Sequence, residues 1–140
     1  MSLVRAQVGE PFSVILVTIM YRMYFIVCLD AVKKMNGIRG KMMTQAGHGY
    51  LHSFWDAQAR FPDDATGYTR VDHPRKITVQ VDSEHDLNAL YAAYRRVCGV
   101  SLVKDSGFTV FNEPTVTGLG IGPIKEDLIG DDLKGLKLFK

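Results

Sequence analysis

The hydrophobic pattern of the chain predicts three strands and one regular helix. Residues 23–29 (MYFIVCL) are apolar at every position, which is typical of a strand buried on both faces of a sheet. Residues 77–81 alternate apolar and polar side chains, and residues 100–103 form a shorter apolar run, so each is expected to be a strand. Between them, Ser83 is a suitable helix N-cap and Gly99 a suitable left-handed C-cap. The apolar positions with helical spacing are Leu87, Leu90, Tyr91, Tyr94 and Val97.

The remaining segments complete a single α/β domain. Residues 40–57 lack proline and predict a second helix, whereas 30–39 and 59–74 contain the turn-forming residues of loops. The strand–helix–strand unit over 76–103 is expected to be a right-handed parallel crossover. The other expected elements are a hairpin-like return over 108–111 and 115–121, a short helix at 124–129 after Pro123, and an edge strand or docked tail at 136–138. We therefore predict a small mixed sheet of four or five strands, flanked by helices.

On a helix over 40–57, polar and apolar side chains separate onto opposite sides. The polar stripe consists of Lys41, Gln45, His48 and His52. The apolar side, expected in the core, consists of Met42, Met43, Ala46, Tyr50 and Phe54, with Gly47 and Gly49 allowing close approach to a sheet. An ordinary solvated face favours Glu and Lys pairs, whereas this stripe has one cation, one amide and two imidazoles. The stripe is therefore either a solvated face or a functional site.

Two glycine-containing stretches do not match known phosphate-binding motifs. The residue after Gly40-Lys41 is Met42, where a Walker loop requires Ser or Thr. The glycines of 118–123 have the wrong spacing for a dinucleotide fingerprint. His48 and His52 have the spacing of paired zinc ligands, but no third ligand is evident. The sequence therefore predicts neither a cofactor nor a metal.

Charge is distributed unevenly along this chain of 140 residues, although its formal net charge is only +2. The segment 31–55 contains no acid, and its basic residues are Lys33, Lys34, Arg39 and Lys41. This cluster predicts a local positive field beside the polar stripe, or else a solvated loop. Cys28 and Cys98 lie far apart among apolar neighbours, which fits a reducing compartment and a packing role.

Residues 1–22 are expected to be an N-terminal extension that leads into the first strand of a domain over 23–140. The apolar runs on either side of Arg22 are both shorter than the roughly 18 residues that cross a bilayer, so no membrane span is expected. Glu10 is the only acid before Asp30. This scarcity of acids is typical of a mitochondrial presequence, which is the alternative to the cytoplasmic location that we expect.

A second stretch with candidate functional side chains follows the strand predicted at 100–103. It contains Asp105, then Ser106-Gly107, then Phe108 and Thr109. The Ser-Gly pair predicts a turn that leaves the carboxylate of Asp105 accessible, near the strand end where α/β folds place ligand sites. A turn-capping aspartate is the simpler alternative.

Taken together, these stretches resemble the type 2 peptidyl-tRNA hydrolases, the archaeal and eukaryotic class. The matching motifs, in order, are Met23–Asp30, Arg39-Gly40-Lys41, Thr44–Gly49, Lys76-Ile77, Asp82-Ser83-Glu84, Asp105–Thr109, Pro114, Thr117, Gly120–Pro123 and Leu136–Leu138. Their order and spacing hold over about residues 23–140. The chain departs from the family where Phe108 replaces a basic residue, where Ile38 lengthens a loop, and where Thr44, Gly47 and Gly49 replace alanines.

The resemblance implies hydrolysis of the ester that joins a peptide to the 3′ end of tRNA, without a cofactor. The implied catalytic residues are Lys41, Asp105, Thr109, Gln45 and His48, and the implied tRNA-binding residues are Lys33, Lys34, Arg39 and Lys76. Lys41 would stabilise negative charge or hold a phosphate, and Asp105 would orient or deprotonate water. The resemblance also implies a homodimer. The departures leave a second hypothesis, an inactive tRNA- or ribosome-associated binding protein of the same fold.

Overall fold

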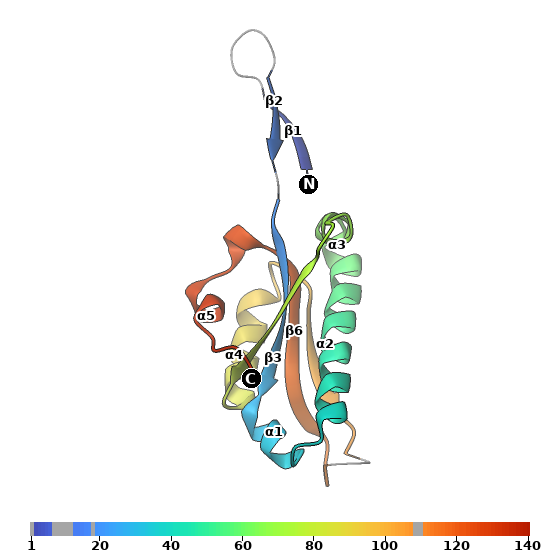
Figure 1. Ribbon diagram of the computed structural model, residues 1–140, viewed down its shortest axis with the longest axis vertical. Coiled ribbons are helices and arrows are strands. Elements are labelled where there is room, and N and C mark those ends of the chain that lie inside the picture. The colour runs from blue at the N-terminus through green and yellow to red at the C-terminus, as the bar shows by residue number, and fades with distance from the viewer. Residues whose placement is uncertain (1, 7–12, 18, 108–110) are drawn as a thin grey trace.

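The computed structural model describes residues 2–6, 13–17, 19–107 and 111–140. Its main sheet has four strands in the order β4-β3-β6-β5 (Figure 1). These strands are β3 (Tyr21–Cys28), β4 (Arg75–Val81), β5 (Val100–Asp105) and β6 (Thr115–Lys125). β3 pairs in parallel with β4, and β6 is antiparallel to both β3 and β5. The predicted mixed sheet is confirmed, and β4 and β5 run in the same direction at its two edges.

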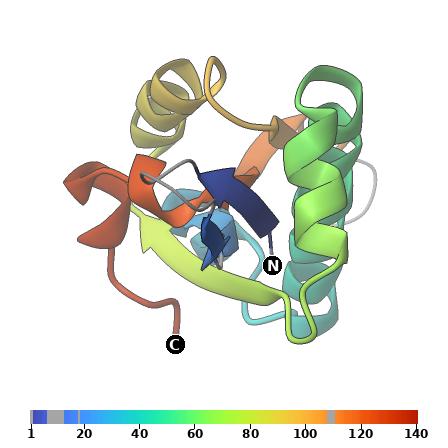
Figure 2. The same ribbon diagram turned by 90° about the horizontal axis from the view of Figure 1, so that it is seen from above.

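Helices cover both faces of this sheet, so the domain has three layers (Figures 1 and 2). α2 (Arg39–Arg60) and α3 (Pro62–Thr69) lie on one face. α4 (Glu84–Tyr94) lies on the other, together with the short α5 (Asp131–Lys134). α1 (Leu29–Lys34) follows β3 directly. The helix predicted after Ser83 is confirmed, and the Ser83 hydroxyl accepts a hydrogen bond from the backbone N–H of Asp86.

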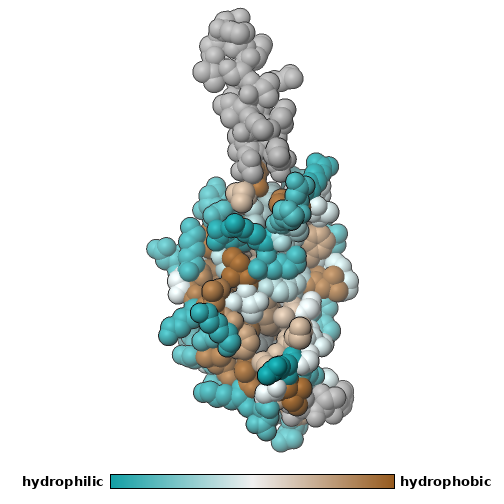
Figure 3. Space-filling view, viewed as in Figure 1, coloured by the Kyte–Doolittle hydropathy of each residue, from teal (hydrophilic) through white to brown (hydrophobic). Residues whose placement is uncertain are grey.

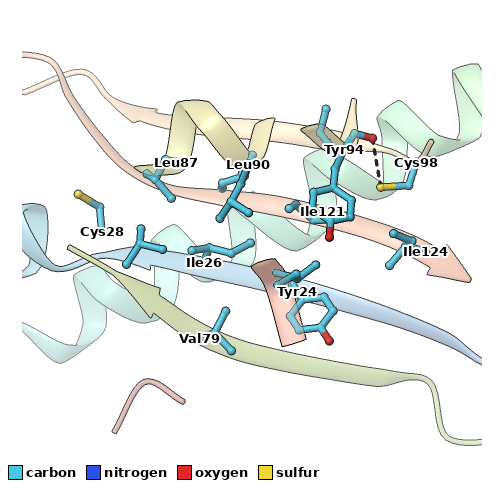
Figure 4. Packing of buried hydrophobic residues seen from close by; sticks show 14 of the residues in the cluster. Tyr24, Ile26, Cys28, Val79, Leu87, Leu90, Tyr94, Cys98, Ile121 and Ile124 are labelled. Carbon is cyan, nitrogen blue, oxygen red and sulfur yellow. Dashed lines mark hydrogen bonds between the residues drawn. The ribbon is translucent and has the colours of Figure 1, made fainter. Parts of the chain in front are cut away.

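The alternate side chains of β3 point into two apolar layers. Tyr24 and Ile26 join a large cluster with residues of α4 such as Leu87 and Leu90 (Figure 4). Phe25 and Val27 pack on the opposite side, beneath α2. Every residue from Met23 to Cys28 is buried. The uninterrupted apolar run therefore reflects a central strand covered on both faces, as predicted.

Two segments expected to be loops contain helices. Residues 29–34 form α1, which has Asp30 in its first turn and Lys33 and Lys34 in its last turn, as the helix dipole favours. Within 59–74, α3 begins at Pro62, with Asp63 and Asp64 in its first turn. Proline and acidic residues are turn formers, but they are also favoured in the first turn of a helix. In α3 the burial of Ala65 and Tyr68 favours the helix over the turn.

Two predicted helix boundaries were also wrong. α4 ends at Tyr94 and is followed by a turn, and Gly99 does not have the positive φ of a left-handed cap. Pro123 does not start a helix, because β6 continues to Lys125 through a cis Gly122-Pro123 peptide. A 3-10 helix then spans Glu126–Leu128. The expected return strand is present as β6, and the other half of that prediction, 108–111, lies largely outside the described residues.

The buried face of α2 is rotated from the one predicted, although Ala46, Tyr50 and Phe54 of the predicted face are partly buried and pack against apolar clusters. Its buried residues recur every four positions: they are Gln45, Gly49, Ser53 and Ala57. Met42 is partly buried and packs against the large apolar cluster, whereas Met43 is 74% exposed and does not anchor the helix. A side chain on Gly120 of β6 would overlap the backbone of Gly49. This glycine-to-glycine contact turns the helix and brings Gln45 into the interior.

Both ends of the chain lie outside the four-stranded sheet. β1 (Ser2–Ala6) and β2 (Ser13–Val17) pair as a separate antiparallel sheet, and β3 begins at Tyr21. The C-terminal tail is docked on the edge of β4, as expected, through hydrogen bonds from Gln80 N–H to the Lys137 carbonyl and from Phe139 N–H to the Thr78 carbonyl. Figure 3 shows hydrophilic residues mixed with small hydrophobic patches on one face. Within the described residues, no helix is long and apolar enough to cross a membrane.

Candidate active site

The site is built around an ion pair between Lys41 and Asp105. Lys41 lies in the first turn of α2, and Asp105 is the last residue of β5. The Lys41 Nζ atom is 2.5 Å from Asp105 Oδ2, and the side chains are 18% and 8% exposed. The pair is therefore largely shielded from water but reachable from it. Lys41 and Asp105 are 64 positions apart, so no local sequence pattern could predict their contact. Only the resemblance to the family implied it.

The turn after β5 holds the second oxygen of the carboxylate. Gly107 has a φ of 87°, a conformation that glycine adopts without strain. Its backbone N–H donates a hydrogen bond of 2.9 Å to Asp105 Oδ1. The turn predicted from Ser106-Gly107 is thus present, and it orients the carboxylate.

Gln45 and Thr117 form a second layer behind the ion pair. The Gln45 side-chain amide donates from Nε2 to Asp105 Oδ2 at 3.4 Å. The Thr117 hydroxyl, on β6, donates to Gln45 Oε1 at 2.7 Å, which directs the amide N–H group toward Asp105. Gln45 is 3% exposed and Thr117 is 1% exposed. A buried polar chain of this kind is stable only when each member has a partner.

Thr117 was not among the residues that the sequence predicted for the site. The sequence feature that indicates Thr117 is its place in the glycine-rich strand 115–121, where it matches a motif of the family. Such a threonine is also common on the surface of a strand. Its role depends on the pairing of β6 between β3 and β5, which places Thr117 beneath α2.

The electrostatics of the site favour an ionised Asp105. The hydrogen-bonded Lys41 ammonium lowers the pKa of Asp105 most strongly, while burial acts in the opposite direction and the Gly107 N–H lowers it further. The net result is a pKa below the ordinary value of 3.8. At neutral pH the site therefore contains a carboxylate paired with an ammonium group.

The other predicted site residues are distributed around this pair. His48 is exposed on α2, and its ring lies 5.5 Å from that of His52, which in turn stacks on Trp55 at 5.3 Å. The structure thus places His48 in a row of exposed rings rather than beside the carboxylate. Thr109 lies outside the described residues. Within the part of the chain that the structure describes, no group of three His, Cys, Asp or Glu residues could hold a metal ion.

The predicted tRNA-binding residues occupy two ends of the sheet. Lys33 and Lys34 are exposed in the last turn of α1, and Arg39 is exposed at the start of α2. α1 follows the carboxyl end of β3, and β5 is parallel to β3, so these three cations lie at the same end of the sheet as Asp105. Lys76 instead pairs in register with Met23, near the start of β3, and its ammonium lies 5.4 Å from the centre of the Tyr68 ring.

A cavity of about 270 Å³ shares Gln45 with this site, although neither Lys41 nor Asp105 lines it. Its walls come from α1, α2, β3, β4, β6 and the C-terminal tail, and they include Gln45 and Thr117. The other lining side chains are apolar except for Thr78. The residues that orient Asp105 therefore also form part of the wall of this cavity.

The fold and the site together define an α/β domain with a shielded lysine–aspartate pair beside exposed cations, an arrangement suited to hydrolysis of an anionic substrate. The family described as "Peptidyl-tRNA hydrolase PTH2" matches residues 21–139. The chain belongs to this family.

Individual relatives agree with this membership. The chain is 33% identical over 102 residues to the peptidyl-tRNA hydrolase of Methanocaldococcus jannaschii, covering 72% of this chain and 88% of that protein. It is 34% identical over 103 residues to the peptidyl-tRNA hydrolase of Methanococcus vannielii, covering 72% and 87%. It is also 33% identical over 103 residues to human "Peptidyl-tRNA hydrolase 2, mitochondrial", covering 72% of this chain and 56% of the human protein.

Proposed function

We propose that this protein hydrolyses the ester bond between a peptide and the 3′ end of tRNA, using a water molecule held at the Lys41–Asp105 pair. The observation that carries the proposal is the 2.5 Å ion pair, supported from behind by Gln45 and Thr117. Membership of the PTH2 family and relatives named peptidyl-tRNA hydrolase supply the substrate. Water is the other reactant, and the resemblance to the family implies that no cofactor is used.

Asp105 orients the attacking water rather than acting as a strong base. Its lowered pKa makes it a weak proton acceptor, because the proton must displace the stabilising contact with Lys41. Oδ2 already accepts hydrogen bonds from Lys41 and Gln45. Oδ1 accepts one from Gly107, and a carboxylate oxygen has two lone pairs, so it retains capacity for water.

Lys41 supplies positive charge where negative charge develops. Attack on the ester produces a tetrahedral oxyanion, and a shielded ammonium stabilises such an anion more strongly than an exposed one. Thr109, two residues beyond Gly107, is proposed from the resemblance to position the water or Asp105. His48 is proposed to contact the acceptor end of the tRNA from the exposed face of α2.

The tRNA backbone is proposed to contact the exposed cations Lys33, Lys34 and Arg39, which lie at the same end of the sheet as Asp105. Phosphates near the scissile ester would meet this positive field first. Lys76 lies at the other end of the sheet and would be reached only by a more distant part of the tRNA. We also propose a homodimer in the cytoplasm, with mitochondrial delivery by residues 1–22 as the alternative. Light scattering and fusion of residues 1–22 to a fluorescent reporter test these two points.

The decisive experiment measures release of N-acetylated amino acid from tRNA by purified wild-type protein and by the variants Asp105→Asn and Lys41→Met. We expect kcat/KM to fall by about 10²–10⁴ in each variant, the range for loss of an acid–base or oxyanion-stabilising group. The matched controls are Asp127→Asn and Lys134→Met, which make the same changes at exposed positions.

The controls are expected to retain wild-type turnover. Wild-type turnover in both site variants would contradict the roles of Lys41 and Asp105. Binding of tRNA by the wild-type chain without any ester cleavage would instead establish the inactive binding protein.

A further inference from the structure

The cavity lined by Gln45 is larger than a packing defect and lies at the lower end of the size range of ligand sites. Its volume is about 270 Å³, several times the roughly 30 Å³ that one water occupies in the liquid. Sites for drug-sized ligands begin at about 300 Å³. The space is therefore suited to one chemical group of a larger substrate that continues outside.

The lining of the cavity favours an apolar group. No charged residue lines it, and its three polar side chains already have partners. Thr117 donates to Gln45, Gln45 donates to Asp105, and the Thr78 hydroxyl lies 3.1 Å from the Tyr50 hydroxyl. A nucleobase in this space would lose its hydrogen bonds to water and gain few in return, which is costly. A hydrocarbon, thioether or aromatic group would lose none.

The position of the cavity identifies which part of the substrate would enter it. We propose that it binds the side chain of the amino acid esterified to the tRNA, and that apolar side chains bind best. This inference rests on the proposed hydrolysis of peptidyl-tRNA. The ester carbonyl must lie beside Lys41 and Asp105, and the side chain of that residue branches from the adjacent carbon. Gln45 contacts Asp105 and lines the cavity, so a single side chain connects the two sites.

Two features of the walls suit a range of apolar side chains. Met42 is partly buried and Met43 is 74% exposed, and both line the cavity. Methionine side chains are flexible and polarisable, so they adapt to groups of different shape. Phe139 closes another side, because the tail is held on β4 by the hydrogen bond from its N–H to Thr78. Met43, which lies outside the core, thus has a role at the substrate.

The first test compares hydrolysis of one tRNA species acylated with N-acetylphenylalanine, N-acetylleucine or N-acetylglycine. The quantity measured is the ratio of kcat/KM for the phenylalanyl or leucyl ester to that for the glycyl ester. We expect a ratio of about ten or more for the wild-type protein, since apolar pockets discriminate on this scale. In Ala46→Leu, which narrows the cavity, the ratio should fall toward one.

The matched control is Ala59→Leu, the same change at an exposed position of the same helix, which should keep the wild-type ratio. If Ala46→Leu does not fold, Phe139→Ala removes a wall instead and should also lower the ratio. Its control is Leu138→Ala, at the neighbouring residue, which is 58% exposed. An unchanged ratio in a folded Ala46→Leu or Phe139→Ala variant would overturn the inference.

A binding measurement separates this inference from the proposed function. The probes are 3′-amino-3′-deoxyadenosine derivatives carrying N-acetylphenylalanine or N-acetylglycine through a stable amide. Using protein with labelled methionine methyl groups, we expect the phenylalanyl probe to shift the Met42 and Met43 signals at concentrations where the glycyl probe does not.

Selective binding without hydrolysis of any ester would support the cavity assignment and contradict the hydrolase. Hydrolysis of all three esters at one rate, without selective binding, would contradict the cavity assignment and leave the hydrolase in place. Absence of both would overturn both proposals.

Discussion

At the scale of single residues, the chemistry depends on how Asp105 is held. One oxygen accepts from Lys41 and Gln45 and the other from the Gly107 N–H, so the carboxylate has a fixed orientation. The Lys41 contact keeps its pKa low despite burial. A pKa that is lower in the folded than in the unfolded protein means that ionised Asp105 stabilises the fold. This stabilisation is fully present above the ordinary pKa of 3.8 and is lost as the pH falls through the lower pKa of the folded state.

The pH dependence of turnover follows from this lowered pKa. We expect kcat/KM of the wild-type protein to show no acid limb from Asp105 between pH 7 and about pH 5, because the carboxylate stays ionised throughout. In Lys41→Met the ammonium group that lowers the pKa of Asp105 most strongly is absent, while burial still raises that pKa. The residual activity should therefore show an acid limb displaced to higher pH. A pH–rate profile of both proteins measures this. An acid limb at the same pH in both would contradict the assigned cause.

Replacement of Thr117 by valine tests the second layer of the site. The change keeps the shape of the side chain but leaves Gln45 Oε1 buried without its 2.7 Å partner. We expect a loss of about 1–3 kcal/mol in the free energy of unfolding and roughly tenfold lower turnover, because the amide is no longer oriented. Thr69→Val on α3 is the control, since its hydroxyl donates to the Ala65 carbonyl away from the site. Equal losses in the two variants, measured by urea unfolding and turnover, would argue against the orienting role.

At the scale of elements, the site depends on the close packing of α2 on β6. A side chain at Gly49 would overlap the ring of Phe25, and one at Gly120 would overlap the Gly49 backbone. The helix can therefore lie directly on the sheet at this point. One turn earlier, Gln45 then enters the interior and meets Asp105 and Thr117. The contact between these two glycines thus determines the position of Gln45, which is proposed to act in the site.

The two glycines of α2 that flank His48 should respond oppositely to alanine. Gly49→Ala is expected to lower the free energy of unfolding by about 1–3 kcal/mol, because the new methyl group forces the Phe25 ring or the helix to move. Gly47→Ala meets no atom within 4 Å and should raise it by about 0.5–1 kcal/mol through helix propensity. Urea unfolding of both variants measures the difference. Stabilisation by both would show that the packing is looser than the structure indicates.

At the scale of the whole molecule, the parallel direction of β3 and β5 places the proposed site residues at one end of the sheet. Asp105 ends β5, and the cations of α1 and the start of α2 follow β3. Residues from three separate parts of the chain therefore face one region. The acceptor end of a tRNA is expected to approach this end of the sheet.

Binding of uncharged tRNA should accordingly be sensitive to salt. In the triple variant Lys33→Ala, Lys34→Ala, Arg39→Ala, we expect the slope of log K against log salt to become shallower by about two to three, since each lost phosphate contact contributes roughly 0.7–0.9. Lys76→Ala alone should change it by about one. Filter binding at several salt concentrations measures the slopes. Lys134→Ala is the control and should keep the wild-type slope. If the triple variant had the same slope as this control, the proposed contact of tRNA with Lys33, Lys34 and Arg39 would be contradicted.

Much of the architecture could be predicted from patterns that depend on neighbours in the sequence. The apolar run 23–29, the alternation at 77–81 and the capped helix after Ser83 each report local burial, and all three elements are present. The helix α3 was missed because its Pro62, Asp63 and Asp64 have the composition of a turn, and α1 was missed because its six residues are too few to show a helical period. Their burial of Ala31 and Ala65 against the rest of the domain decides their conformation.

The sequence by itself determined the mixed sheet, the helix that contains Lys41 and Gln45, and the family to which the chain is similar. Only the tertiary structure decided which face of α2 is buried, since the helical period leaves its rotation open until Gly49 meets Gly120. The same contact separates Gln45, which is buried against Asp105, from the exposed His48. Thr117 and the apolar cavity also required the fold, because strand pairing and helix packing bring together residues that are distant in the chain.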